Sequence, residues 1–210
     1  MLKQILWTFL AVAGVASAQT YYAGVVGGYA LGPDLTITNG TSKASVGLKG
    51  SGVLGALGGG DTAKYWGGEV RYMVQFSDLK LASGGTEVDF SSKTHTVTGD
   101  ILGYFTPRDS AVRPYFSFGG GVRVLVGTGQ ESAAQPLSNF AALTATRETL
   151  AVGDFGVGLK MRLSRAVHLR LEVRDYIGQA PSKVIAPNTG SKMSGVLNDV
   201  VAVAILSYDW

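Results

Sequence analysis

Residues 152–178 read VGDFGVGLKMRLSRAVHLRLEVRDYIG and contain two stretches in which apolar side chains alternate with small or charged ones. The second stretch shows this most clearly, in the order Leu169, Arg170, Leu171, Glu172, Val173 and Arg174. A period of two places successive side chains on opposite faces of a β-strand, whereas at helical spacing these charges would scatter around the cylinder. A short Ser-Arg turn links the stretches, so the segment predicts an antiparallel hairpin with one apolar and one charged face.

The same alternation recurs along the chain and predicts eight strands, at about 20–30, 45–59, 65–77, 93–105, 113–127, 148–163, 168–178 and 198–209. The connections alternate between long and short, and the short ones contain the turn residues Gly60-Asp61, Pro107-Arg108-Asp109-Ser110 and Ser164-Arg165. Long connections at one end and tight turns at the other are typical of outer-membrane barrels. The predicted fold is therefore all-β, an eight-stranded antiparallel up-and-down transmembrane β-barrel.

The composition of the 210-residue chain excludes several other classes of protein. Hydrophobic residues make up 46% of it and the formal net charge is only +3, which argues against intrinsic disorder. The absence of cysteine excludes a disulfide scaffold and a thiolate zinc site. Three surplus positive charges do not make the basic stripe of a nucleic-acid-binding protein, so we expect no nucleic-acid partner.

The first 18 residues, MLKQILWTFLAVAGVASA, have the organisation of a secretory signal peptide. Lys3 precedes an apolar run, and Ala16-Ser17-Ala18 fits the small-x-small cleavage pattern. A transmembrane anchor is the alternative, but a spanning helix needs about 20 apolar residues and this run is shorter. We expect residues 1–18 to be a signal peptide and residues 19–210 to form the outer-membrane barrel domain.

The orientation of the two faces decides between a membrane barrel and a soluble one. In a membrane barrel the apolar face contacts lipid and the charged face lines the interior, whereas in a soluble exported barrel the apolar face would surround a small apolar ligand. Glycines beside long charged residues, as at Gly156 and Gly158, favour the crowded interior of a narrow barrel. Both charge signs occur on that face, which allows pairing. We therefore predict a structural charge network that plugs the interior, formed by Glu69, Arg71, Asp100, Arg123, Asp154, Lys160, Arg162, Arg170, Glu172 and Arg174.

Aromatic residues near the ends of the predicted strands add to this interpretation. Transmembrane barrels carry aromatic girdles at both membrane interfaces. The girdle residues predicted on this basis are Tyr21, Tyr22, Tyr65, Trp66, Tyr104, Phe105, Tyr115, Phe116, Tyr176, Tyr208 and Trp210.

The second strand of the hairpin carries a more specific resemblance. It contains an Arg-Leu-Glu-x-Arg-x-Tyr pattern, which Arg170, Leu171, Glu172, Arg174 and Tyr176 match. Together with the glycine-alternating strand and short turn before it, this segment resembles the penultimate hairpin of the outer-membrane protein A type (OmpX-like) β-barrel family. The resemblance implies an eight-stranded barrel in the outer membrane of a Gram-negative bacterium, inserted by the barrel-assembly machinery.

The last strand, DVVAVAILSYDW, resembles the C-terminal insertion signal of that class. The signal residues are Leu206, Tyr208 and Trp210, although the chain ends in tryptophan where the family usually has phenylalanine. The other face of the strand carries apolar residues where polar ones are expected, namely Val201, Val203 and Ile205. The sequence therefore leaves the facing of this strand open.

Few residues are candidates for catalysis or for binding a cofactor or metal. Gly50–Gly55 matches G-x-G-x-x-G, but a dinucleotide site needs a helix after the motif, and the glycine-rich stretch that follows cannot start one. His95 and His168 are 73 positions apart and form no local metal chelate. A lipid-modifying barrel enzyme could use either histidine, with Asp175 as an acid on the apolar side of its strand. We expect no catalytic residue, no cofactor and no metal site.

The sequence thus predicts a non-enzymatic outer-membrane barrel that supports membrane integrity or interacts with partners through four extracellular loops. Its expected partners are outer-membrane lipid and, during insertion, the barrel-assembly machinery, and we expect a monomer. Two alternatives remain open: an outer-leaflet lipid-modifying barrel enzyme, and a soluble exported barrel that carries a small apolar ligand.

Overall fold

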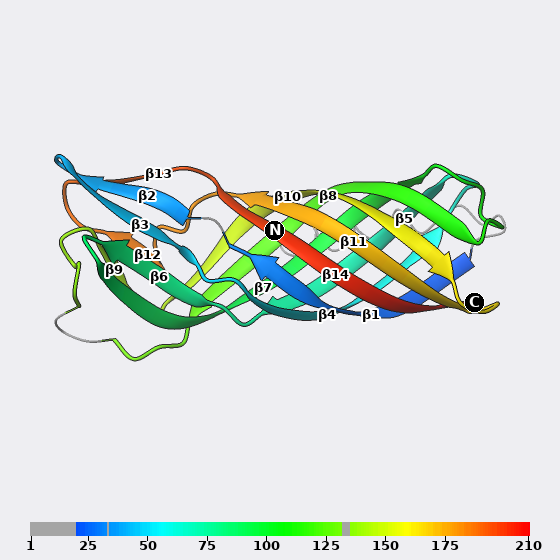
Figure 1. The fold of residues 1–210 in the computed structure, drawn as a ribbon, viewed down its shortest axis with the longest axis horizontal. Coiled ribbons are helices and arrows are strands. Elements are labelled where there is room, and N and C mark those ends of the chain that lie inside the picture. Colours follow the sequence, from blue (N-terminus) through cyan, green and yellow to red (C-terminus); the bar gives the residue numbers. More distant parts are fainter. Residues whose placement is uncertain (1–19, 33, 132–134) are drawn as a thin grey trace, which may run out of the picture.

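The computed structural model describes residues 20–32, 34–131 and 135–210 (Figure 1). The signal peptide predicted at residues 1–18 lies outside the described residues. Within these ranges no helix is long and apolar enough to cross a membrane. The regular structure consists of β1 (Thr20–Leu31), β2 (Asp34–Asn39), β3 (Ser42–Leu48), β4 (Ser51–Asp61), β5 (Trp66–Gln75), β6 (Asp78–Ser83), β7 (Thr86–Tyr104), β8 (Val112–Gly127), β9 (Ala141–Leu143), β10 (Arg147–Arg162), β11 (Val167–Gly178), β12 (Ile185–Pro187), β13 (Ser191–Ser194) and β14 (Leu197–Asp209).

Eight of these strands close into a barrel. Each pairs antiparallel with its two neighbours, in the cyclic order β1, β4, β5, β7, β8, β10, β11 and β14, with β14 returning to β1. The predicted eight-stranded antiparallel barrel is confirmed. One boundary prediction was wrong: the segment 45–59 is two strands, β3 and β4, because the chain leaves the ladder at Lys49 and Gly50.

The two ends of the barrel differ. The turn end holds Thr20, Trp210 and the three short connections at residues 62–65, 105–111 and 163–166. Asp61, predicted to lie in the first turn, is instead the last residue of β4. The opposite end, the loop end, carries the four long connections, which contain β2, β3, β6, β9, β12 and β13 (Figure 1).

The long connections fold into an ordered layer rather than open loops. Strands β13, β2, β3 and β6 pair in that order and continue onto the first residues of β7, while β12 pairs with β9. This loop layer surrounds an apolar cluster whose fully buried members include Ile37, Val46, Leu79, Leu81, Leu143 and Val184. Figure 1 shows these strands gathered beyond the end of the barrel wall.

The barrel wall has its apolar face outside. Val157, Leu171 and Val173 are about half exposed, at 52%, 46% and 49%. Arg170 and Glu172, which alternate with them, are buried. This facing is that of a membrane barrel and the reverse of a soluble carrier, whose apolar face would be the core.

Strand β14 resolves the question of facing that its sequence left open. Leu206 and Tyr208 are exposed at 49% and 58%, whereas Val201, Val203 and Ile205 are buried. The last three pack in the interior with apolar side chains of β1 and β4, among them Val26, Val53 and Leu57. The interior is therefore divided: β14, β1 and β4 line it mainly with apolar groups, and the opposite strands line it with charges.

Candidate functional site

The centre of the interior holds a network of ion pairs that crosses the barrel. Arg71 on β5 donates to both carboxylate oxygens of Glu172 on β11, at 2.6 and 3.0 Å. In return, Arg170 on β11 donates two hydrogen bonds to Glu69 on β5, at 2.8 and 2.9 Å. All four side chains are at most 1% exposed. Since β5 and β11 are not neighbours in the wall, these bonds connect its opposite sides.

Arg174 extends this network toward the other charged strands. Its Nη1 donates to Asp100 on β7 at 2.5 Å and to Asp154 on β10 at 2.8 Å. Its Nε and Nη2 donate to Glu172 at 2.9 and 3.1 Å. One guanidinium therefore donates hydrogen bonds to carboxylates from three strands. We call the set the central network: Glu69, Arg71, Asp100, Asp154, Arg170, Glu172 and Arg174.

Tyrosines lie beside the central network, and their positions correct part of the predicted girdle. Tyr115 donates to Glu172 at 2.7 Å and Tyr22 to Glu69 at 3.2 Å. Arg170 lies between the two rings, with its guanidinium carbon 5.2 and 5.5 Å from their centroids. The girdle prediction was wrong for four residues. They occupy the alternate positions that point inward, as the charged residues do, and are buried in the interior: Tyr22, Tyr104, Tyr115 and Tyr176.

A second cluster closes the turn end. Lys160 contacts Asp209 at 2.7 Å and Asp61 at 3.9 Å, and Arg113 donates to Asp61. His168 Nδ1 lies 3.2 Å from Asp209. Asp61, Arg113 and Asp209 were not predicted to line the interior, although Arg113 points to the same face of its strand as Tyr115.

The predicted network residues thus fall into separate groups. Arg123 pairs with Asp199 of β14 at 2.8 Å, nearer the loop end, and Asp199 was not predicted. The prediction was wrong for Arg162, which is exposed at the rim of the turn end and donates to the backbone carbonyl of Asp109. The other nine predicted residues are buried in the interior.

Small residues make room for these long side chains. A Cβ on Gly158 would lie 2.7 Å from the Tyr115 ring, and one on Gly156 would lie 2.7 Å from Ser117 Oγ and 3.2 Å from Arg174 Nε. Long side chains therefore crowd the interior around Gly156 and Gly158.

A carboxylate also ties the loop layer to the wall. Glu148, near the start of β10, accepts hydrogen bonds from the backbone N–H groups of Ser182, Lys183 and Val184 at 3.0, 2.7 and 3.3 Å. Burial alone would raise the pKa of Glu148, but these hydrogen bonds favour the charged form and hold the pKa below its usual value. The ionised carboxylate thus stabilises the connection between β11 and β12.

The residues considered for chemistry lie apart. His95 is on the outer face of β7, where its Nδ1 is 2.8 Å from the Tyr72 hydroxyl. Asp175 is on the outer face of β11, separated from β7 by two strands, and accepts a hydrogen bond from Asn198 at 3.2 Å. His168 is at the turn end, and Gly50–Gly55 runs into β4 rather than a helix. Among the described residues, no three histidine or acidic side chains form a group that could hold a metal ion.

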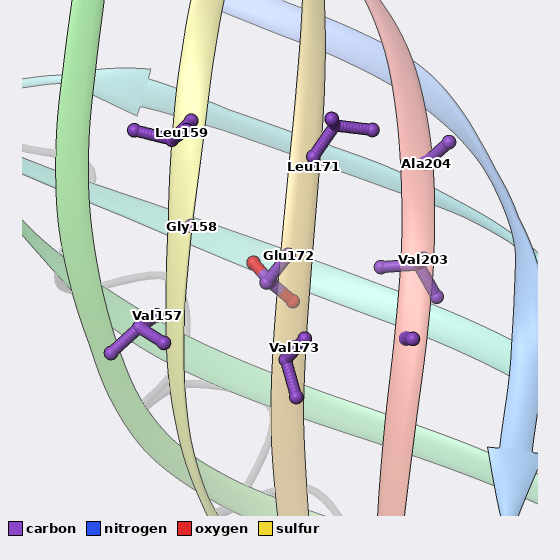
Figure 2. Close-up of a pocket in the computed structure, with 9 residues that line it drawn as sticks. Val157, Gly158, Leu159, Leu171, Glu172, Val173, Val203 and Ala204 are labelled. Carbon is purple, nitrogen blue, oxygen red and sulfur yellow. The ribbon is translucent and has the colours of Figure 1, made fainter.

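A shallow depression on the outer wall is apolar. It lies between β10, β11 and β14, with a volume of about 570 Å³, where Ala202 and Ala204 leave space beside Val157, Leu159 and Leu171 (Figure 2). Glu172 and Val203 border it from the interior face and are buried. No exposed polar group lines this depression that could orient a substrate.

Comparison with protein families yields a match over most of the chain. The model of the outer membrane protein beta-barrel domain matches residues 8–193. No sequence among curated proteins matches.

Solved structures show the same fold. Neisserial surface protein A is 10% identical, with a TM-score of 0.56 over 92% of this chain and all of that one. The outer membrane protein OprG from Pseudomonas aeruginosa is 15% identical, with a TM-score of 0.60 over 92% of this chain and 96% of that one. The outer membrane protease OmpT from Escherichia coli is 9% identical, with a TM-score of 0.50 over 91% of this chain and 97% of that one. At these identities the likeness concerns the fold alone.

Proposed function

We propose a structural, non-enzymatic role for this protein, which belongs to the outer membrane protein β-barrel domain family and is located in the outer membrane of Gram-negative bacteria. Its interior is a plug, and its four long connections present a folded surface outside the cell. The observation that carries the proposal is the central network, because its bonds cross the interior instead of lining an open channel.

The plug is supported at three levels. The Lys160 cluster closes the turn end, the central network fills the middle, and the apolar cluster of the loop layer fills the loop end. Moving a hydrated ion through would require breaking buried pairs, each of which leaves an uncompensated charge. We therefore infer that the barrel does not conduct.

Planar-bilayer recording tests this inference. The refolded protein is expected to give no large, steady openings, while a porin with an open channel, measured in the same bilayers, gives them. Steady openings of the wild-type protein that remain after repurification would contradict the plug.

The outward position of the long connections is a second part of the proposal. Bacterial barrels have short periplasmic turns and longer extracellular loops. The chain has no cysteine, so single cysteines report on each end. Lys192→Cys in β13 should react with a membrane-impermeant maleimide in intact cells, and Arg165→Cys in the last short connection only after permeabilisation. The reverse pattern would overturn this orientation.

The absence of enzymatic activity is supported by the separation of the candidate residues. OmpT is a protease, so the fold alone is compatible with catalysis. Here His95 and Asp175 lie on separate parts of the wall, and His168 lies at the opposite end of the barrel from the loop layer. Mass analysis of lipids should be identical in cells with and without the protein. A lipid modification that disappears with His95→Ala or His168→Ala would establish the enzyme instead.

We also propose that Leu206, Tyr208 and Trp210 form the signal read by the barrel-assembly machinery. All three are exposed on the outer face of the last segment. Trp210→Phe should leave the amount of folded barrel in the membrane unchanged, whereas Trp210→Ser should lower it several-fold. Leu31→Ala, also exposed but at the other end, is the control. Equal insertion of the Trp210→Ser variant would reject the signal.

A further inference from the structure

The outer face of β7 changes character toward the loop end. Ile101 and Val97 are apolar and 49% and 42% exposed, as a lipid-facing wall requires. His95, Lys93 and Ser91 follow on the same face, and Lys93 and Ser91 are exposed. The apolar band of this strand therefore ends between Val97 and Lys93. Lys93 is therefore the first cationic side chain beyond the apolar, lipid-facing part of this strand.

Neighbouring aromatic rings hold the two basic side chains in place. The Tyr72 hydroxyl is 2.8 Å from His95 Nδ1, and the two rings stack with centroids 6.1 Å apart. When the hydroxyl donates to Nδ1, the ring proton is on Nε2, which becomes a donor. Lys93 Nζ lies 5.8 Å from the centroid of the Phe76 ring. In this tautomer the wall presents an ammonium and an imidazole N–H beside two aromatic rings.

Lys93 differs from Lys49, which lies between β3 and β4. Lys49 pairs with Glu87 at 2.9 Å and with Asp89 at 2.6 Å, so its charge is neutralised within the protein. Among the described residues, no carboxylate lies within ion-pair distance of Lys93. Its charge is available to an external anion.

We propose that Lys93, His95 and Tyr72 form an external binding site for the phosphate group of an outer-leaflet glycolipid. The inference goes beyond the structural role and depends on the long connections being extracellular, which the cysteine experiment tests separately. Lys93 supplies the charge, and His95 Nε2 supplies a directed hydrogen bond. Phe76 and Tyr72 contact the apolar part of the lipid at the interface.

The chemistry favours a phosphate at this position. A lysine ammonium binds phosphate as a point charge, and a charge near an anionic membrane surface contributes attraction that falls off within a Debye length. The wall on the other side of the barrel has the opposite chemistry, since Asp175 and Asn198 are the polar pair there. Asp175 and Asn198 offer no cation to a phosphate.

Native mass spectrometry of the refolded full chain in detergent tests the site. The probe is lipid A with two phosphate groups, compared with dephosphorylated lipid A, phosphatidylglycerol and inorganic phosphate. We expect the diphosphorylated lipid to bind the wild-type protein, and Lys93→Gln to weaken that binding by roughly fivefold, since one lysine near an anionic lipid surface contributes about 1 kcal/mol. Lys93→Arg should retain binding within about twofold, because the positive charge stays at the same depth.

Lys64→Gln is the matched control. Lys64 Nζ also lies over an aromatic ring, 5.4 Å from the centroid of Tyr65, but at the turn end and without a histidine. Its replacement should leave binding unchanged, while Tyr72→Phe should weaken it less than Lys93→Gln.

Several results would overturn the proposal. Equal losses for Lys64→Gln and Lys93→Gln would mean a non-specific charge effect. Equal binding of dephosphorylated lipid A would mean that only the acyl chains are recognised. Competition by phosphatidylglycerol at equal concentration would mean a general anionic-lipid surface, and displacement by millimolar inorganic phosphate would mean an adventitious ion site only.

Discussion

The barrel wall and the loop layer are built from the same kind of alternating strand but face opposite ways. In the wall, Arg170 and Arg174 are buried while Val157 and Leu171 are exposed. In the loop layer, Ile37 and Val46 are buried and the charged side chains of Lys49 and Asp89 are exposed. The change occurs within single strands, since β7 contributes Phe90 to the apolar cluster and Asp100 to the central network.

The difference shows that the surrounding solvent, rather than the strand itself, decides which face is inside. Lipid favours apolar side chains outside, and the charges must then be paired within the barrel. Water beyond the membrane favours the reverse, and the apolar side chains form a core. The two regions should therefore respond differently to the removal of a charge and to the removal of a methyl group.

The largest effect is expected from Arg174→Met. This change leaves Asp100 and Asp154 buried without the cation that joins them, and breaking a buried pair costs about 3–5 kcal/mol. Arg123→Met should act in the same direction by isolating Asp199. The measurement is urea unfolding in lipid vesicles, with the folded fraction determined from the heat-dependent gel shift of the barrel. Arg162→Met, at the exposed rim, is the control and should change the unfolding free energy by less than about 0.5 kcal/mol. An unchanged midpoint for Arg174→Met would refute the network.

Ile37→Ala tests the apolar half of the comparison. Ile37 is fully buried, and truncating such a side chain costs about 2–5 kcal/mol. Because it lies outside the wall, we expect faster proteolysis of the loop layer in vesicles, with little change in the gel shift. Thr36→Ala, exposed on the same strand, should not alter the proteolysis rate. A large loss of the barrel itself would mean that the two regions unfold as one unit.

Two glycines sharpen the contrast between the inner and outer faces of the wall. A Cβ on Gly158 would meet the Tyr115 ring and the Leu171 carbonyl oxygen at 2.7 Å, whereas a Cβ on Gly52 would meet nothing within 4 Å. Gly158→Ala should destabilise the barrel by about 1–3 kcal/mol. Gly52→Ala should be neutral or slightly stabilising. Similar unfolding midpoints for the two variants would argue against a crowded interior.

The smallest effect is expected at Glu148, which links the two regions. Its pKa is lower in the folded protein than in the unfolded chain, so it stabilises the fold above the unfolded pKa. That contribution is lost as the pH falls through the folded pKa. Proteolysis of the segment after β11 should therefore accelerate at acidic pH in the wild-type protein. Glu148→Gln should lose about 1–2 kcal/mol at neutral pH and show a flatter pH profile. Parallel profiles would assign the pH dependence to another group.

The alternation of side chains along each strand predicted most of the residues that line the interior, and the errors of this prediction have physical causes. Arg162 has the inward parity, but it is the last residue of β10 and its long side chain reaches the aqueous rim. Tyr22 and Tyr115 were assigned to the girdle because they are close to strand ends, although they share the inward parity. The alternation along a strand predicts whether a side chain points inward, but it does not predict how near that residue lies to the end of the barrel.

Partners across the barrel were beyond sequence reasoning. Arg71 and Glu172 are separated by 101 positions, and only closure of the wall makes them neighbours. The loop layer was also not predicted. β9, β12 and β13 are only three or four residues long and too short to show a period, while β2 and β6 lie in segments assigned to the long connections.

By itself the sequence determined the eight strands, their antiparallel order and the apolar face that contacts lipid, because these depend on a period of two and on the lengths of the connections. Tertiary structure alone decided that Val203 and Ile205 face inward and which charges pair. It also decided that the long connections form a core of their own. Strand periodicity is a local property of the chain, whereas pairing across a barrel depends on tilt and register, which exist only after closure.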